Sequence, residues 1–120
     1  MLRLLRQHEL VASAILPVEI RGALRRRAAE KVIQSSRLPA ALQQLAKDRA
    51  QWNLLTVSTE ILDRAEQIVA GHPVRTLDAI HIASAQEFAG RLQAHVPFIS
   101  ADHRQIEAAA AAGLIVQQVG

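Results

Sequence analysis

The sequence predicts an α/β domain: a short parallel sheet with helices on both faces. Short apolar runs alternate along the chain with longer stretches whose apolar residues recur at helical spacing, a pattern typical of covered parallel sheets. The only aromatic residues are Trp52, Phe88 and Phe98, so the core is aliphatic. A length of 120 residues without a linker or a repeat indicates a single domain over residues 1–120.

The first half of the chain is expected to contain three helical segments and two strands. Residues 2–7 have the pattern of the tail of a helix, and residues 10–13 that of a strand. The next helix starts at Pro17, whose missing N–H costs nothing in a first turn, and is predicted to run to about Gln34. Pro39 opens another helix, and residues 54–57 form the second predicted strand.

The second half repeats the alternation. Ser58 or Thr59 is expected to cap a helix that the Gly-His-Pro segment 71–73 ends. The remaining predicted elements are a helix capped by Thr76 and running to about residue 89, a strand over 97–100, a helix over 104–112 and a strand over 114–117.

The composition excludes several classes of protein. The absence of cysteine rules out disulfides and thiolate metal sites, and it is compatible with a reducing compartment. No apolar run approaches the 18 residues or so that a membrane span requires. The polar residues 7–9 interrupt the basic start before a signal peptide could form. We therefore expect a cytoplasmic protein that does not contact membranes.

The basic residues are unevenly distributed. Arg21, Arg25 and Arg26 lie close together, and the 14 basic residues of the chain include only two lysines. Because arginine makes bidentate contacts to phosphate, this cluster is compatible with a nucleic-acid partner. A solvated helix face is the other interpretation, and the sequence leaves both open.

Three carboxylates occur at the ends of apolar elements. Asp78 precedes the apolar segment 79–85, Asp102 follows the apolar run 98–101, and Glu19 comes shortly after Pro17. Acids in enclosed positions are costly unless a cation or hydrogen bonds hold them. Each also has a structural explanation: Asp78 can complement a helix dipole, Asp102 can cap a helix, and Glu19 can be an ordinary first-turn residue.

Taken together, the three acids favour a metal site. If Glu19, Asp78 and Asp102 converge within about 5 Å, each pair repels by roughly 3 kcal/mol at an effective dielectric constant of 20. A divalent cation would remove this repulsion, and oxygen ligands favour Mg²⁺ or Mn²⁺ over Zn²⁺. Such a site would support phosphodiester hydrolysis, with the three acids as catalytic and metal-binding residues. His81, on the same helical face as Asp78, could orient that carboxylate, touch substrate or be a satisfied buried histidine.

Segments 11–24, 75–85, 98–102 and 112–114, in this order, resemble the PIN-domain family, and within it the VapC-type toxins of bacterial toxin–antitoxin pairs. The resemblance extends over nearly the whole chain, and the Asp78 segment is its most specific part. It implies a Mg²⁺-dependent endoribonuclease acting on structured RNA, usually tRNA or rRNA. It also implies a homodimer, inhibited by a cognate antitoxin that inserts a C-terminal segment into the active-site groove.

By this resemblance, Glu19, Asp78 and Asp102 are three of the four family acids, with Ser100 as a nearby polar contributor. Arg21, Arg25, Arg26 and His81 become candidates for contacts to RNA or to an acidic antitoxin segment. The family begins with a strand that ends in Asp, whereas this chain has no Asp before Asp48. We therefore expect the central N-terminal strand of the sheet to be missing. A misassigned gene start, a truncation, or a strand supplied by another chain would each explain this.

Two further functions stay open. The first is a catalytically inactive PIN-like fragment that acts as a protein-binding module, for example toward an antitoxin, and the missing fourth acid motivates it. The second is a DNA-binding repressor, which the arginine cluster suggests but which leaves Asp78 and Asp102 unexplained.

Overall fold

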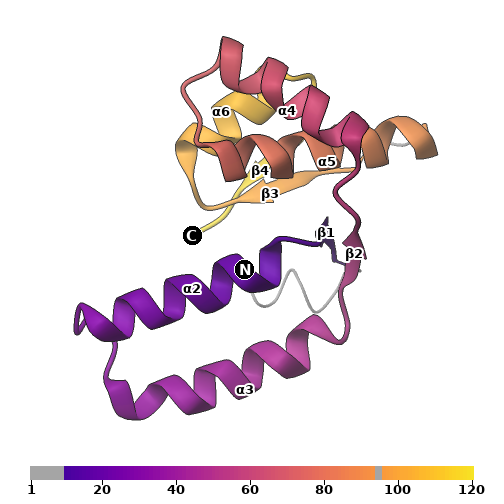
Figure 1. Ribbon diagram of the computed structural model, residues 1–120. Coiled ribbons are helices and arrows are strands. Elements are labelled where there is room, and N and C mark those ends of the chain that lie inside the picture. Colours follow the sequence, from indigo (N-terminus) through magenta and orange to yellow (C-terminus); the bar gives the residue numbers. More distant parts are fainter. Residues whose placement is uncertain (1–9, 94–95) are drawn as a thin grey trace.

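A computed structural model of the protein describes residues 10–93 and 96–120, and the helix expected over 2–7 lies outside these residues. Helices alternate with short strands, which confirms the α/β class (Figure 1). The elements are β1 (Val11–Ser13), α2 (Leu16–Ala29), the 3₁₀ turn η1 (Ser35–Arg37), α3 (Leu38–Arg49), β2 (Asn53–Leu55), α4 (Thr59–Gly71), α5 (Thr76–Leu92), β3 (Phe98–Ser100), α6 (His103–Ala111) and β4 (Val116–Gln118).

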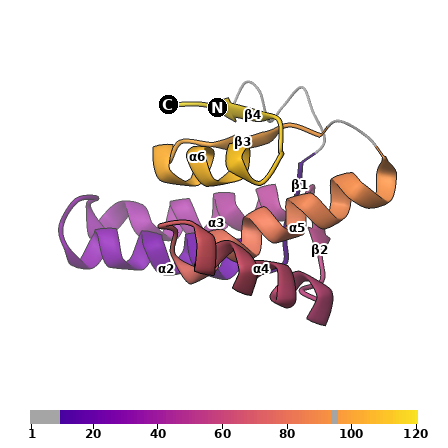
Figure 2. The same ribbon diagram turned by 90° about the horizontal axis from the view of Figure 1, so that it is seen from above.

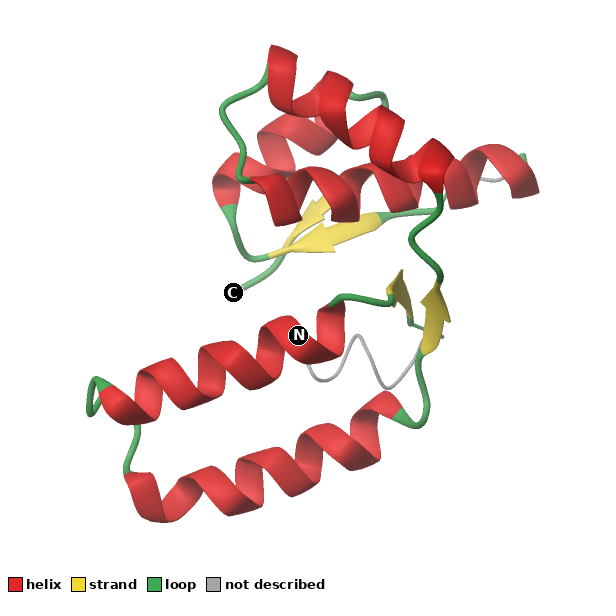
Figure 3. Cartoon of the chain, in the orientation of Figure 1, coloured by secondary structure: helices red, strands yellow, loops and turns green. Residues whose placement is uncertain are grey.

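The strands pair in parallel, as predicted, but in two separate pairs. β1 pairs with β2 in the register Val11↔Asn53, and β3 pairs with β4 in the register Phe98↔Val116. Over residues 10–93 and 96–120 no ladder joins one pair to the other, and the two pairs stand apart in Figure 3.

Helix α4 packs on α5, α5 packs on α6, and α6 packs on β3 and β4, and these elements together form the body of the molecule (Figure 2). Its core is aliphatic and rich in alanine: Ala79, Ile82 and Ala83 of α5 are fully buried against Ile61, Ala65 and Ile68 of α4 and Ala108 and Ala109 of α6. Because alanine side chains are small, the axes of these helices can approach one another closely. No helix in the described part of the chain is long and apolar enough to cross a membrane.

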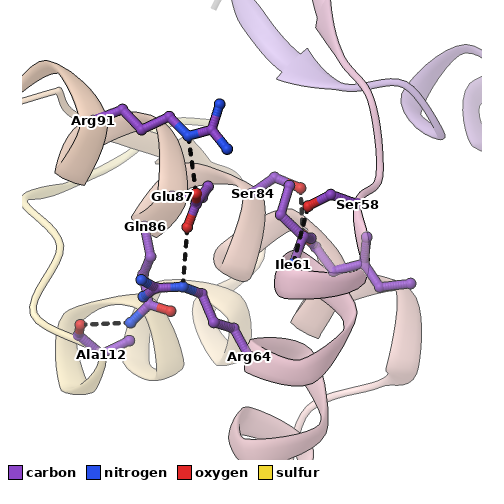
Figure 4. A network of polar contacts seen from close by, with 9 residues as sticks. Ser58, Ile61, Arg64, Ser84, Gln86, Glu87, Arg91 and Ala112 are labelled. Atoms are coloured by element: carbon purple, nitrogen blue, oxygen red, sulfur yellow. Dashed lines mark hydrogen bonds and ion pairs between the residues drawn. The ribbon is translucent and has the colours of Figure 1, made fainter.

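Polar contacts join the helices of the body (Figure 4). Arg64 of α4 and Arg91 of α5 both pair with Glu87 of α5, at 3.2 and 2.9 Å. Gln86 of α5 donates a hydrogen bond to the Ala112 carbonyl just after α6, at 2.9 Å. The hydroxyl of Ser58 accepts a hydrogen bond from the Ile61 N–H, so the expected cap at the start of α4 is confirmed.

Helices α2 and α3 form an arm that extends beside the body together with β1 and β2 (Figure 1). The arm has little core of its own: Pro17 and Ala28 are the buried residues of α2, and Leu45 is that of α3. Val18 is 67% exposed and Val32 is 63% exposed. The helices of the arm therefore contain fewer buried residues than those of the body.

Two helix ends differ from the predictions. α2 stops at Ala29 instead of Gln34, because Lys31 adopts a left-handed conformation at φ 61°. The N–H groups of Lys31 and Val32 then bond back to the Ala28 and Arg27 carbonyls, a C-terminal cap that usually contains glycine. At the start of α5, Thr76 is the first helical residue, and Arg75 occupies the cap position without a side-chain cap bond.

Candidate functional site

The predicted site residues line two neighbouring cavities. A groove of about 1110 Å³ lies between the arm and the body, with walls from β1, α2, α5 and β3. Glu19, Arg26, Asp78, His81 and Ser100 line it, beside an apolar surface. A smaller pocket of about 450 Å³ is lined by Pro73, Val74, Arg75, Asp78, Asp102 and Arg104. Asp78 belongs to both cavities, whereas Glu19 lines the groove and Asp102 lines the smaller pocket.

Asp78 lies in the first turn of α5, where its negative charge complements the positive end of the helix. The residue is half-buried, less enclosed than its apolar sequence context suggested. Its Oδ1 accepts a hydrogen bond from Nε2 of Gln105, at 3.0 Å. Because Gln105 belongs to α6, this bond ties the starts of two helices together, and it leaves the second carboxylate oxygen available.

Glu19 and His81 contact each other across the groove. Oε1 of Glu19, on α2, meets Nε2 of His81, on α5, although the two residues lie 62 positions apart in the chain. Their side chains are 25% and 15% exposed, respectively. The contact is an ion pair when His81 is protonated and a hydrogen bond when it is neutral. His81 thus orients Glu19, where sequence reasoning connected it with Asp78.

Asp102 caps α6, which was the structural explanation considered for it. Its Oδ1 accepts a hydrogen bond from the Arg104 N–H at 2.9 Å, and its own N–H donates to Oγ of the buried Ser100 at 3.0 Å. The side chain of Asp102 is exposed and borders the smaller pocket. A cap bond occupies only part of a carboxylate, so this role leaves room for a ligand contact.

Carboxylates are the right donors for a divalent cation, but their arrangement does not fit a formed metal site. Nowhere in residues 10–93 and 96–120 do three or more His, Asp or Glu side chains gather closely enough to hold a metal ion. Glu19 is engaged with His81, and Asp102 is engaged as a cap. The expected convergence of all three acids at one point is therefore not found.

The three arginines proposed as contacts are exposed on α2, and Arg26 is the one that lines the groove. Gly22, one turn earlier, leaves space for the Arg26 side chain: a β-carbon at Gly22 would lie 3.3 Å from Nη1 of Arg26. Arg21 and Arg25 do not line either cavity.

Sequence reasoning missed Arg75, Arg104 and Gln105. Arg75 and Arg104 line the smaller pocket, and Gln105 holds Asp78. Arg75 lies three positions before Asp78, and Arg104 lies two after Asp102, so proximity to the predicted acids was an available signal.

Within this α/β domain, Asp78 at the start of α5 and Asp102 at the start of α6 place two carboxylates on the wall of one pocket. A model of the PIN domain family matches residues 1–111, so this chain belongs to the PIN domain family. PIN domains are generally nucleases that use divalent metal ions. No curated protein and no solved structure matches the chain.

Proposed function

We propose that this chain is an endoribonuclease of the VapC type, which hydrolyses RNA phosphodiester bonds as the toxin of a type II toxin–antitoxin pair. Glu19, Asp78 and Asp102 are the acids of the proposed site. The observation that carries the proposal is the position of Asp78, which forms part of the groove that contains Glu19 and of the pocket that contains Asp102. A single substrate strand lying across Asp78 would therefore meet all three acids.

The proposal includes a requirement for Mg²⁺ or Mn²⁺, because carboxylate oxygens are the ligands these ions prefer. In the described arrangement the acids do not form a group that could hold an ion. Ion binding would therefore have to draw them together. Such binding would raise the melting temperature of the protein, since a ligand that binds only the folded state stabilises it.

The proposed partners follow from the two kinds of surface in the groove. Arg26 supplies a cation for an RNA phosphate, with Arg21 and Arg25 beside it on the exposed face of α2. The apolar wall of the groove suits a segment of a cognate antitoxin. We further propose structured RNA such as tRNA or rRNA as substrate, a homodimeric assembly and a cytoplasmic location.

The direct test is RNA cleavage by purified protein. We expect the parent chain to cut structured RNA in the presence of Mg²⁺ or Mn²⁺ and to lose activity with EDTA. Asp78→Asn should lower the rate by about 100-fold or more, since removal of a single transition-state contact costs about 10²–10³. Asp63→Asn, an exposed acid on α4, is the matched control and should keep the parent rate. Equal rates for the two variants would contradict the proposal.

A second function is favoured by the separation of the acids and by the apolar wall of the groove. We propose as the alternative a catalytically inactive PIN-like module that binds a protein segment in this groove. It predicts no RNA cleavage with any divalent ion and no rise in melting temperature with Mn²⁺. Cleavage that is lost in Asp102→Ala would exclude it.

A further inference from the structure

The smaller pocket combines two acids with two arginines. It lies where α5 and α6 both begin, and the hydrogen bond from Gln105 to Asp78 holds these two helix starts together. Arg75 occupies the position before α5, and Arg104 is the second residue of α6. Both guanidinium groups are carried by exposed residues on the wall of one pocket of about 450 Å³.

The local structure does not explain the positions of these two arginines. Each stands at the positive end of a helix, where a cation is electrostatically unfavourable. Within the described residues neither guanidinium forms an ion pair with Asp78 or Asp102, although all four residues line the same pocket. The two guanidinium groups are therefore available for an external anion.

The charges of the pocket select the kind of anion. Two carboxylates in the wall repel a ligand with two negative charges, such as inorganic phosphate or a terminal phosphate, more strongly than one with a single charge. A phosphodiester carries a single charge, and its two free oxygens match the planar fork of a guanidinium. An internal phosphate of a nucleic-acid strand meets both conditions.

We propose that Arg75 and Arg104 bind a backbone phosphodiester of the RNA next to the bond that is cut. The inference rests on the proposed function for the identity of the strand, and it assigns the two arginines a positioning role. Asp78 belongs to both cavities, so a strand held at Arg75 and Arg104 passes directly beside this acid and continues toward Arg26 in the groove.

The test is the salt dependence of RNA binding, measured by fluorescence anisotropy with a labelled 12-nucleotide single-stranded RNA in EDTA, where cleavage is prevented. Each lost phosphate contact lowers the slope of log K against log salt by about 0.7 for single strands. Because both arginines contact the same phosphate, the double variant Arg75→Gln/Arg104→Gln should lower this slope by roughly 0.7 and the affinity by about tenfold or more. Arg75→Lys/Arg104→Lys should bind with intermediate affinity, because it keeps the charge and loses the fork.

Arg37→Gln/Arg49→Gln is the matched control, because it removes the same charge from two exposed positions at the two ends of α3. It should bind RNA with an affinity within about twofold of the parent.

A displacement experiment tests the kind of anion. Inorganic phosphate and uridine 5′-monophosphate should not displace the RNA at concentrations at which a dinucleotide does. Displacement by inorganic phosphate as effective as that by the dinucleotide would overturn the assignment to a phosphodiester. The melting temperature of each variant shows whether it is folded. If a double variant does not fold, the two corresponding single variants are measured in its place.

Failure of this inference can be told from failure of the proposed function. If the parent cleaves RNA and Arg75→Gln/Arg104→Gln binds and cleaves like the control, the inference is wrong and the nuclease stands. If binding depends on Arg75 and Arg104 but no divalent ion supports cleavage, the phosphate site stands and the nuclease is wrong. An absence of RNA binding by the parent overturns the inference as well.

Discussion

The body and the arm of this molecule are built differently, although both contribute to the candidate site. Helices α4, α5 and α6 share a closed aliphatic core and hold Asp78 and Asp102. The arm, α2 and α3 with β1 and β2, buries few side chains and carries Glu19 and Arg26. In the part of the chain that the structure describes, the Glu19–His81 contact is the one side-chain hydrogen bond that joins arm and body.

The two halves of the site therefore have different mechanical support. Asp78 and Asp102 are fixed relative to each other because Gln105 and the core hold the starts of α5 and α6 together. The position of Glu19 depends on a thin arm, and a region with few buried contacts opens at a lower free energy than a core. A substrate or an ion can therefore adjust Glu19 more easily than Asp78.

The largest expected effect comes from the core of the body. Ile82→Ala removes a fully buried side chain from α5 and should lower the free energy of unfolding by about 2–5 kcal/mol. Val18→Ala on the arm, where the side chain is 67% exposed, should change it by no more than about 0.5 kcal/mol. Urea denaturation measures both, and similar losses in the two variants would contradict the contrast between arm and body.

The second prediction concerns the link between the two regions. His81→Ala leaves the partly buried Glu19 without its partner and should cost about 1–3 kcal/mol. Hydrogen exchange should accelerate in α2, while the amides of the segment 79–83 in α5 keep their protection. His103→Ala is the control, since His103 meets Glu107 at the surface with both side chains more than 60% exposed. Unchanged exchange in α2 would show that the contact does not hold the arm.

The third prediction compares two Gly→Ala substitutions in helices, one at Gly90 with open space around it and one at Gly22, which lies against Arg26. Gly90→Ala in α5, where a β-carbon meets nothing within 4 Å, should stabilise the protein by about 0.5–1 kcal/mol. Gly22→Ala should stabilise it less, because the Arg26 guanidinium must move a few tenths of an ångström from the new methyl group. Differential scanning calorimetry measures both variants. An equal gain at the two sites would mean that Arg26 does not rest on Gly22.

The smallest effect is a pH dependence at the start of α4. Two hydrogen bonds to the Glu60 carboxylate hold its pKa below the ordinary value of 4.5. The backbone N–H of Glu60 itself donates the one with the larger effect, and the Ser58 hydroxyl donates the other. Because the pKa is lower in the folded state, the stabilisation is present above about pH 4.5 and is lost as the pH falls through the folded value. Glu60→Gln should flatten the stability profile below that pH, and a profile identical to the parent would contradict the capping role.

Local signals in the sequence predicted much of the fold. Ser58 before a helical pattern predicted the start of α4, and α6 ends close to the predicted residue 112, where Gly113 adopts a left-handed conformation at φ 89°. The end of α2 was missed because a lysine, Lys31, takes the conformation that normally signals itself through glycine. The division of the strands into two pairs depends on tertiary contacts, which local periodicity does not record.

The candidate site shows the same limit. Sequence reasoning selected Glu19, Asp78 and Asp102 from their positions at element ends, and all three border the two cavities. It did not find their partners, because Glu19 meets His81 across 62 positions and Asp78 meets Gln105 across 27. Which side chains form these pairs depends on how α2, α5 and α6 pack together, and that packing cannot be read directly from a single sequence.

Under the proposed function, Glu19 of the arm and Asp102 of the body act on one RNA strand together with Asp78, which lines both cavities. The most direct measurement is a double-mutant cycle on the rate of RNA cleavage with Glu19→Gln, Asp102→Asn and their combination. Residues that act as a unit are strongly non-additive, so we predict that the double variant is about as slow as the slower single variant. A Glu19→Gln protein that cleaves at the parent rate, or losses that simply multiply in the double variant, would contradict the claim.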